Sequence, residues 1–185
     1  KKYSSEIKDQ NFNKFLINQI IKKKLKNGFI GVSIDSKKIK KNNLFVAIKG
    51  TKHDGHDFIK DSLRKGAKYC IVSKKSKKNY SKKLIKVSNT SIFLKKLAEI
   101  KRLNTKAKII AVTGSSGKTT VKNLLGNLLK TYDKSYFSPK SFNNHFGVPL
   151  SISNLEQSFN YGVFEVGMSR RGEIFNLSKI IKLNI

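Results

Sequence analysis

Apolar and polar residues alternate along the first half of the chain in patterns typical of both helices and strands. Apolar residues at helical spacing between positions 10 and 26 predict an opening helix. Asp57 is expected to cap a second helix, which runs to Lys65 and ends at Gly66, where a left-handed C-cap costs least. Four apolar runs have the length of strands: residues 29–34, 44–48, 69–72 and 84–87. Together these elements predict a small α/β unit over residues 1–88.

The second half has the pattern of a helix, a strand, a glycine-containing loop and another helix. We expect the first helix to form a linker over residues 89–104, because its apolar positions have helical spacing. The predicted elements after it are a strand at 109–113, a helix with apolar positions from 121 to 129, a strand at 162–167 and a helix from 172 to about 182. This order predicts a second unit, residues 105–185, that begins a parallel sheet. Such a sheet usually contains about five strands, so two strands predict a fragment of a longer protein.

Positive charge is the strongest feature of the composition. The 185 residues include 40 Lys and Arg against 11 Asp and Glu, which gives a formal net charge of +29. Of the 40 basic residues, 36 are Lys and 4 are Arg, and the lysines are spread over the whole chain. Recognition of base edges and phosphates favours the planar guanidinium of Arg. We therefore interpret the charge as a composition bias and expect no specific nucleic-acid partner. A basic P-loop module that binds nucleic acid is the alternative of another class.

Membrane and disulfide classes are disfavoured by the same composition. No apolar stretch approaches the about 18–20 residues that a membrane span needs, and the first thirty residues lack the apolar core of a signal peptide. A cytoplasmic location is expected. Cys70 is the single cysteine and lies in an apolar run, so we expect a buried structural thiol.

The loop after the strand at 109–113 has the residues of a phosphate-binding loop. It reads Gly114-Ser115-Ser116-Gly117-Lys118-Thr119-Thr120, a G-x-x-G-K-T variant in which Val112 stands where the longer motif has glycine. Backbone N–H groups of such a loop, with the positive end of the following helix, form a cradle for a triphosphate. Lys118 would neutralise the β- and γ-phosphates, and the Thr119 hydroxyl would reach Mg²⁺. An ordinary strand-to-helix turn is the alternative.

Two further segments of the second unit contain polar side chains suited to a ligand. Glu165 lies in a predicted apolar strand, where burying a carboxylate is costly unless it is paired. A metal ion held together with Thr119 would pair it; otherwise it would face solvent or a lysine. The unusual loop at 141–150 contains Asn143, Asn144 and His145 side by side, which could orient a polar ligand beside the phosphates. A structural or solvated role for His145 is equally open.

The first unit has one candidate segment. Ser33, Asp35, Ser36 and Lys37 follow a predicted strand and supply small hydroxyls and a cation, which suit a pyrophosphate or a ribose. A polar turn with an Asp cap is the alternative, and the residues alone do not choose between the two.

These segments resemble the Mur ligase superfamily. Residues 111–120 match its ATP loop. Three segments resemble the MurF branch, the UDP-N-acetylmuramoyl-tripeptide:D-alanyl-D-alanine ligases: residues 143–150, 165–168 and 172–174. Three others are similar to the UDP-binding domain that MurF shares with MurE: residues 35–39, 43–50 and 54–59. The Asn-Asn-His-x-Gly-x-Pro motif favours MurF over MurE, and MurE or another Mur-type amino acid ligase is the alternative within the enzymes.

The resemblance implies a function for the full-length protein. It would be an ATP- and Mg²⁺-dependent ligase that adds D-alanyl-D-alanine to UDP-N-acetylmuramoyl-tripeptide in peptidoglycan synthesis, through an acyl phosphate, and we expect a monomer. The implied fold is a small N-terminal α/β substrate domain followed by the start of a parallel-sheet, P-loop ATP-binding domain. Members of the family have a third domain, so the 185 residues alone are expected to bind the UDP substrate but not to complete the ligation.

The resemblance also implies a role for each matching residue. Lys118 and Glu165 would be catalytic, and Thr119 and Glu165 would hold the metal. Substrate-binding roles fall on Ser33, Asp35, Ser36 and Lys37. ATP-binding roles fall on Gly114, Ser115, Ser116, Gly117, Lys118, Thr119, Thr120, Asn143 and Asn144. Two positions depart from the family: Lys37 replaces the usual Arg, and Ser169-Arg170-Arg171 replaces the usual Asn-His-Pro.

Overall fold

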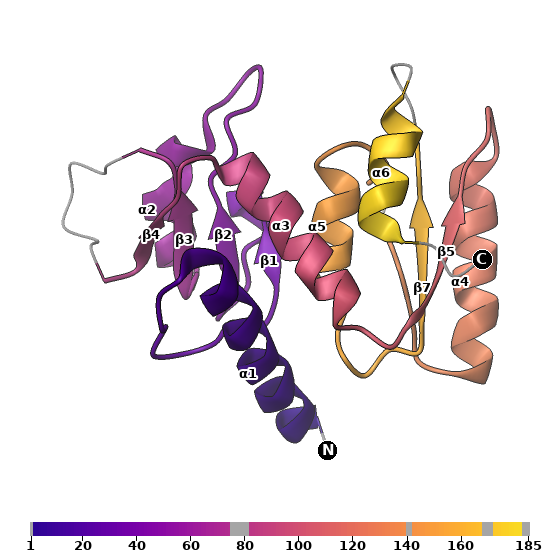
Figure 1. Cartoon of the computed structure of the whole chain (residues 1–185), viewed down its shortest axis with the longest axis horizontal. Helices are drawn as coiled ribbons and strands as arrows, with labels where there is room; N and C mark the ends of the chain where they lie inside the picture. The colour runs from indigo at the N-terminus through magenta and orange to yellow at the C-terminus, as the bar shows by residue number, and fades with distance from the viewer. Residues whose placement is uncertain (1, 75–81, 140–141, 168–171, 183–185) are drawn as a thin grey trace. The chain divides into compact units, whose positions relative to one another are not determined.

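The computed structural model describes residues 2–74, 82–139, 142–167 and 172–182. It divides into two compact units, Lys1–Lys96 and Leu97–Ile185, each with a parallel sheet (Figure 1). The division falls inside helix α3 (Thr90–Leu103). The presence of this helix confirms the helix predicted at 89–104. The α/β class with parallel strands is therefore confirmed. The departure at Ser169-Arg170-Arg171 lies outside the described residues.

The sheet of the first unit has four parallel strands in the order β1-β2-β3-β4. They are β1 (Val32–Ser33), β2 (Leu44–Val46), β3 (Tyr69–Val72) and β4 (Leu84–Lys86). Every residue of β2 and β3 is buried, as expected for parallel strands covered on both faces. All four predicted strands exist, but the first is much shorter than residues 29–34. The Asn13 amide donates to the carbonyls of Phe29 and Ile30 at 2.9 and 3.0 Å, so these groups do not join the ladder.

Helix α1 (Lys2–Ile21) precedes this sheet and differs in its bounds from the predicted range, 10–26. Lys22 has a φ of 50°, which ends the helix, and the Leu25 N–H then donates to Asn18 Oδ1 at 2.9 Å. Leu16 and Ile17 are fully buried, whereas Phe15, one of the apolar residues whose spacing between positions 10 and 26 predicted the helix, is 55% exposed. The buried stripe is therefore rotated relative to the predicted one.

Two short helices connect β2 to β3: the 3-10 turn η2 (Gly55–Phe58) and α2 (Ile59–Arg64). The prediction that Asp57 caps this segment is wrong. Asp54 is the cap, because its Oδ1 accepts the N–H of His56 at 3.0 Å and so starts the helical path three residues earlier. Gly66 has a φ of 103°, which confirms the predicted left-handed end. Cys70 of β3 is buried, and burial raises its pKa to about 12, as expected of an inert thiol.

The sheet of the second unit has the order β5-β7-β6, all parallel. The strands are β5 (Lys108–Val112), β6 (Ser135–Phe137) and β7 (Tyr161–Glu165), and the helices are α4 (Lys118–Tyr132), α5 (Gly147–Ser153) and α6 (Glu173–Ile181). The prediction of two strands is wrong, because β6 is a third; its three residues are too few to show a period of two. The predicted loop at 141–150 is also wrong in part, since residues 147–150 form the start of α5.

Helix α4 buries a lysine and a glycine, while several of its large apolar residues stay exposed. Lys122 and Gly126 are buried, whereas Val121, Leu124 and Leu128 are more than half exposed. A Cβ added at Gly126 would lie 2.4 Å from Cδ1 of Phe137, so glycine allows the helix to approach β6 closely. The core of this unit is instead formed by β5, β7, α5 and α6 residues, including Ile109, Ile152, Phe164 and Ile180.

Across the described parts of the chain, every helix is too short or too polar to span a bilayer.

Candidate functional site

The glycine loop joins β5 to α4 and leads into the first turn of the helix (Figure 1). Gly117 is the residue before the helix and has a φ of 72°, a conformation that strains residues with a Cβ. A Cβ at Gly117 would meet nothing within 4 Å, so the backbone conformation and not space requires glycine there. No side chain caps this helix start, and Gly114, Ser115, Ser116 and Gly117 are all exposed. The first N–H groups of α4 are thus available to an anion.

Lys118 is the first residue of α4, and its side chain folds back over the loop. Its Nζ donates to the carbonyl of Gly114 at 2.7 Å and lies 3.4 Å from that of Ser115. The ammonium is therefore held beside the exposed loop amides. This position allows Lys118 to offset the charge of a bound phosphate.

Glu165 is at the end of β7 and is only 2% exposed. Its Oε2 accepts the Thr119 hydroxyl at 2.7 Å, and its Oε1 accepts the Asn143 amide at 2.8 Å. The Gly167 N–H donates to the Asn143 carbonyl at 2.9 Å and fixes that residue in turn. The structure therefore brings Thr119, Asn143 and Glu165 together, although they are 46 and 22 positions apart in the chain.

The oxygens of Thr119 and Glu165 are hard ligands of the kind that Mg²⁺ prefers. Among the described residues, no three His, Cys, Asp or Glu side chains gather as a metal site. This pair still fits Mg²⁺, which usually binds one or two protein oxygens and completes its shell with water and phosphate.

Lys122 is a residue of this region that sequence reasoning missed. It is fully buried, and its Nζ donates to the Ser138 carbonyl at 2.7 Å. Burial lowers the pKa of the ammonium, and the negative charge of Glu165 raises it to a smaller extent. One signal could have found it: position 122 is three residues after Thr119, so both lie on one face of a helix.

Not every predicted residue joins the Glu165 cluster. The Asn144 Oδ1 accepts the N–H groups of Phe146 and Gly147 at 3.1 and 2.8 Å, which organises the first turn of α5. His145 is exposed and packs on the Phe146 ring, with centroids 4.1 Å apart. Thr120 is exposed on α4. A ligand role for these side chains stays a prediction.

The candidate segment of the first unit forms a capped polar turn. The Ser33 hydroxyl donates to the Asp35 carbonyl at 2.9 Å and accepts the Asp35 N–H at 3.1 Å. Asp35 Oδ1 then accepts the N–H of Lys37 at 2.9 Å and caps η1 (Ser36–Lys38). Ser36 is buried, and its carbonyl accepts Lys65 Nζ at 3.2 Å, whereas the Lys37 side chain is exposed. The turn and a ligand site are compatible, since the turn presents Lys37.

A second polar cluster lies beyond the carboxyl ends of β2 and β3. His56 Nδ1 is 2.6 Å from Asp54 Oδ1, and Lys74 Nζ is 2.7 Å from Asp54 Oδ2. The Lys74 ammonium, helped by His56, holds the pKa of Asp54 well below its usual range. His56 Nε2 accepts the backbone N–H of Ser73 at 2.9 Å. This bond occupies the lone pair that would activate the Ser73 hydroxyl, 3.2 Å away, so the Ser-His-Asp arrangement is a structural lock.

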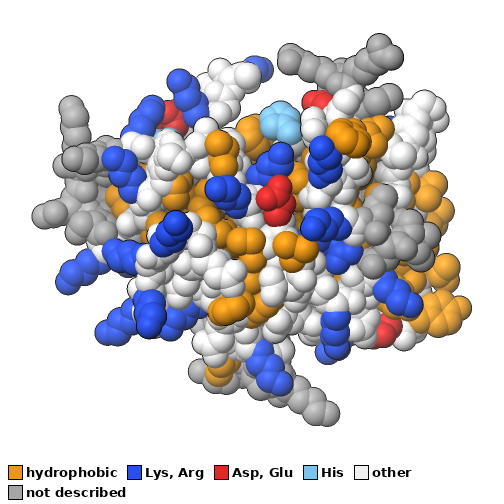
Figure 2. All heavy atoms as spheres, viewed as in Figure 1, with side chains coloured by type: hydrophobic (Ala, Val, Ile, Leu, Met, Phe, Trp, Pro, Cys, Tyr) orange, Lys and Arg blue, Asp and Glu red, His pale blue; other side chains and the backbone are white. Residues whose placement is uncertain are grey.

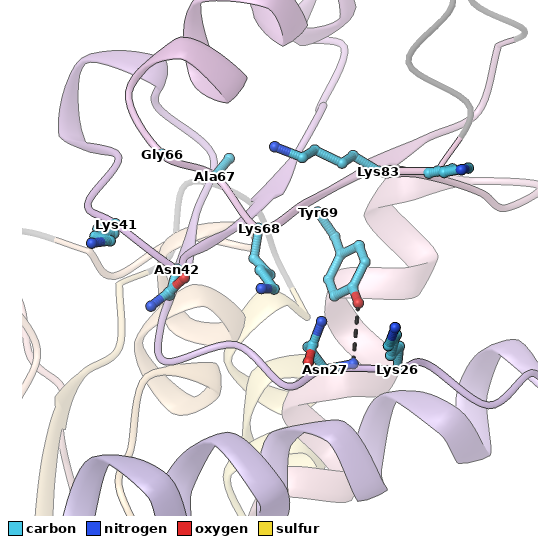
Figure 3. A pocket seen from close by; sticks show the side chains of 10 residues that line it. Lys26, Asn27, Lys41, Asn42, Gly66, Ala67, Lys68, Tyr69 and Lys83 are labelled. Atoms are coloured by element: carbon cyan, nitrogen blue, oxygen red, sulfur yellow. Dashed lines mark hydrogen bonds between the residues drawn. The ribbon is translucent and has the colours of Figure 1, made fainter. Parts of the chain in front are cut away.

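A basic hollow of about 480 Å³ lies at the opposite, amino-terminal edge of the same sheet (Figure 3). It contains none of the predicted substrate residues. The Tyr69 hydroxyl accepts the Asn27 N–H at 3.3 Å on its wall. The lining residues are Lys26, Asn27, Lys41, Asn42, Gly66, Ala67, Lys68, Tyr69, Lys82 and Lys83. Ligands of parallel α/β sheets bind beyond the carboxyl ends of the strands, which favours the edge with Lys37 and Lys74.

Comparisons with known proteins cover both units. Residues 29–113 match the family described as "Mur ligase family, catalytic domain", and residues 112–185 match "Mur ligase middle domain". The UDP-N-acetylmuramoyl-tripeptide--D-alanyl-D-alanine ligase of Rickettsia prowazekii is 43% identical over 154 residues, which cover 83% of this chain and 34% of that protein. The chain thus spans about a third of the length of the curated relatives it matches.

Solved structures agree with the sequence matches. A crystal structure of MurF from Acinetobacter baumannii has a TM-score of 0.79 and 28% identity, covering 92% of this chain and 39% of that one. MurF ligase from Thermotoga maritima in complex with ADP has a TM-score of 0.67 and 39% identity, covering 81% of this chain and 35% of that one. The arrangement of elements described above is therefore similar to that of these ligases.

Proposed function

This chain belongs to the Mur ligase family, and from that premise we propose that it carries the substrate-binding and ATP-binding parts of a ligase joining D-alanyl-D-alanine to UDP-N-acetylmuramoyl-tripeptide. The observation that carries the proposal is the buried Glu165, bonded to Thr119 directly behind an exposed glycine loop. A hydroxyl and a carboxylate placed together at such a loop suit a nucleoside triphosphate with its metal ion. The likeness to a MurF ligase in complex with ADP supports ATP as the nucleotide.

The proposed reaction has two steps. A carboxylate oxygen of the tripeptide attacks the γ-phosphorus of ATP, so a P–O bond forms and ADP leaves. The amine of D-alanyl-D-alanine then attacks the acyl carbon, phosphate leaves, and the amine gives up a proton as the amide forms. Proteins promote such phosphoryl transfer mainly by positioning and by neutralising charge.

This chain's residues supply those two contributions. The N–H groups after Gly114 and Gly117 would bind the phosphate oxygens, and Lys118 would offset charge on the transferred group. Thr119 and Glu165 would hold Mg²⁺, which supplies further charge neutralisation when bound. In the first unit, Lys37 and the turn that presents it would bind the diphosphate of the UDP substrate.

The test is a substrate matrix with the whole protein, read out as ATP-dependent phosphate release and product mass. We expect turnover with UDP-N-acetylmuramoyl-tripeptide and D-alanyl-D-alanine, and none when either is omitted. A MurE-type ligase would instead use UDP-N-acetylmuramoyl-dipeptide with a single amino acid. Turnover with that second pair alone would overturn the proposal.

The basic composition does not change this proposal. Figure 2 shows Lys and Arg scattered over the visible face among other side chains, without one continuous stripe. We therefore expect only weak binding to duplex DNA, with a Kd of roughly 10⁻⁴–10⁻⁶ M at physiological salt and no sequence preference. Fluorescence anisotropy with two unrelated duplexes measures this. A nanomolar, sequence-selective complex would favour a nucleic-acid-binding function instead.

A further inference from the structure

Lys122 is the largest charged side chain that the described residues bury completely, and the proposed function does not use it. An ammonium is among the most expensive groups to remove from water. An apolar side chain of similar length would fill the same space between α4 and the sheet without that cost. The presence of lysine at this position therefore indicates that its charge or its hydrogen bond contributes to the structure or function of the site.

The contacts of Lys122 lead to the backbone of Glu165. Its Nζ donates to the Ser138 carbonyl at 2.7 Å, one residue after the end of β6. The Ser138 N–H donates to the Val163 carbonyl of β7 at 3.0 Å. The Glu165 N–H in turn lies 3.4 Å from the Ser138 hydroxyl. Lys122 thus joins the helix of the glycine loop to the strand ends that position the carboxylate.

The Lys122 ammonium also interacts electrostatically with the Glu165 carboxylate. The carboxylate is buried, and Thr119 and Asn143, which donate hydrogen bonds to it, are neutral. The favourable electrostatic interaction between Lys122 and Glu165 compensates part of the desolvation of both groups. Removal of the ammonium would leave the Ser138 carbonyl without this donor and Glu165 without this compensation.

We propose that Lys122 is a positioning residue for the metal-binding carboxylate. It ties α4 to Ser138 and so keeps Glu165, Thr119 and Asn143 in the arrangement that receives the Mg²⁺ of a bound nucleotide. This inference rests on the proposed function of the glycine loop, and it assigns to Lys122 no contact with the nucleotide itself.

The test measures ADP binding to the whole protein by calorimetry, with Mg²⁺ and with EDTA. The quantity compared is the factor by which Mg²⁺ strengthens ADP binding. We expect Lys122→Met to reduce this factor about tenfold or more, as loss of a group supporting a metal ligand usually does, while ADP affinity in EDTA stays the same. Lys122→Arg, which keeps the charge and donors, should retain most of the factor.

Two matched variants complete the design. Lys130→Met makes the same substitution at an exposed lysine of α4 and should leave the factor unchanged. Glu165→Gln removes the charge of the metal ligand and should lower the factor at least as far as Lys122→Met does.

Each outcome bears on one of the two proposals. If Lys122→Met leaves the factor by which Mg²⁺ strengthens ADP binding unchanged, the inference is overturned. This holds whether ADP affinity is unaltered or falls equally with and without Mg²⁺, and the second case would show a purely structural role. Absence of Mg²⁺-dependent ADP binding in the unsubstituted protein would instead overturn the proposed function. If circular dichroism shows Lys122→Met to be unfolded, Lys122→Gln and Lys122→Arg are compared. An equal factor in these two would overturn the inference, and a lower factor in Gln would support it.

Discussion

The two units hold their candidate ligand groups in different ways. In the first unit, Ser33, Asp35 and Lys37 are hydrogen-bonded to one another within a span of five residues, at the end of β1 in a sheet whose central strands are entirely buried. In the second unit, Glu165 is bonded to groups 22 and 46 positions away, and it is buried. A local turn can form whenever its strand forms, whereas the hydrogen bonds of Glu165 exist only when α4, β7 and the segment that contains Asn143 are packed together. Damage to packing should therefore affect the two sites unequally.

The largest expected effect is at Lys118. Lys118→Ala in the whole protein should lower the ligation rate on the order of 10²-fold or more, because a preorganised charge at the transferred phosphate is lost. Binding of the UDP substrate to the first unit should not change. Phosphate-release kinetics and calorimetry measure the two quantities, with Lys130→Ala as the exposed-lysine control on the same helix. Near-normal turnover would remove the glycine loop from the ATP site.

Packing of the second unit can be broken at Gly126. Gly126→Val places a Cβ 2.4 Å from the Phe137 ring, and such overpacking typically costs about 1–3 kcal/mol of stability. Asn127→Val is the control, because it puts the same β-branched residue at an exposed position of α4. Hydrogen exchange measured over both units should show loss of protection in residues 97–185 and little change in residues 1–96. Equal loss in both units would contradict the comparison.

The local site of the first unit can be strengthened instead. Lys37→Arg replaces a point charge by a planar fork that can bind a phosphate through two hydrogen bonds, and we expect affinity for the UDP substrate to rise about threefold to tenfold. Lys40→Arg changes an exposed neighbour outside the turn and should have no effect. ADP binding should be the same in all three proteins. A fall in UDP-substrate affinity in Lys37→Arg would argue against a phosphate contact at position 37.

The smallest expected effect is the pH dependence of the Asp54 lock. The folded-state pKa of Asp54 is depressed by Lys74, so its stabilisation is present above the unfolded pKa of 3.8 and is lost as the pH falls below it. Asp54→Asn should therefore lower the free energy of unfolding by about 1 kcal/mol at pH 7, since Lys74 is mostly exposed. Urea titrations at several pH values should show this difference shrinking below pH 3.8. Asp57→Asn, which makes the same substitution at an exposed carboxylate of the same turn, is the control.

The central strands of the first sheet and the glycine loop between a strand and a helix could be predicted from the sequence, because they depend on short-range patterns. Apolar runs of strand length identify β2 and β3, and glycine at positions 114 and 117 followed by Lys118 and Thr119 identifies the loop. The capped turn at Asp35 is equally local, since its bonds join residues two positions apart.

Only the tertiary structure decided what lies behind the loop. The three residues of β6 have no detectable period, and they form a strand because β7 pairs with them. The apolar periodicity of α4 predicts that its leucines face the sheet. In the structure Gly126 packs against Phe137 and Lys122 donates to the Ser138 carbonyl. Leu124 and Leu128 are therefore exposed. Lys122 and Glu165 each reduce the cost of burying the other, and both are buried by strands that are distant in the sequence. The spacing of Lys122 from Thr119 is local, but its electrostatic interaction with Glu165 joins residues distant in the sequence and becomes visible only once the chain is folded.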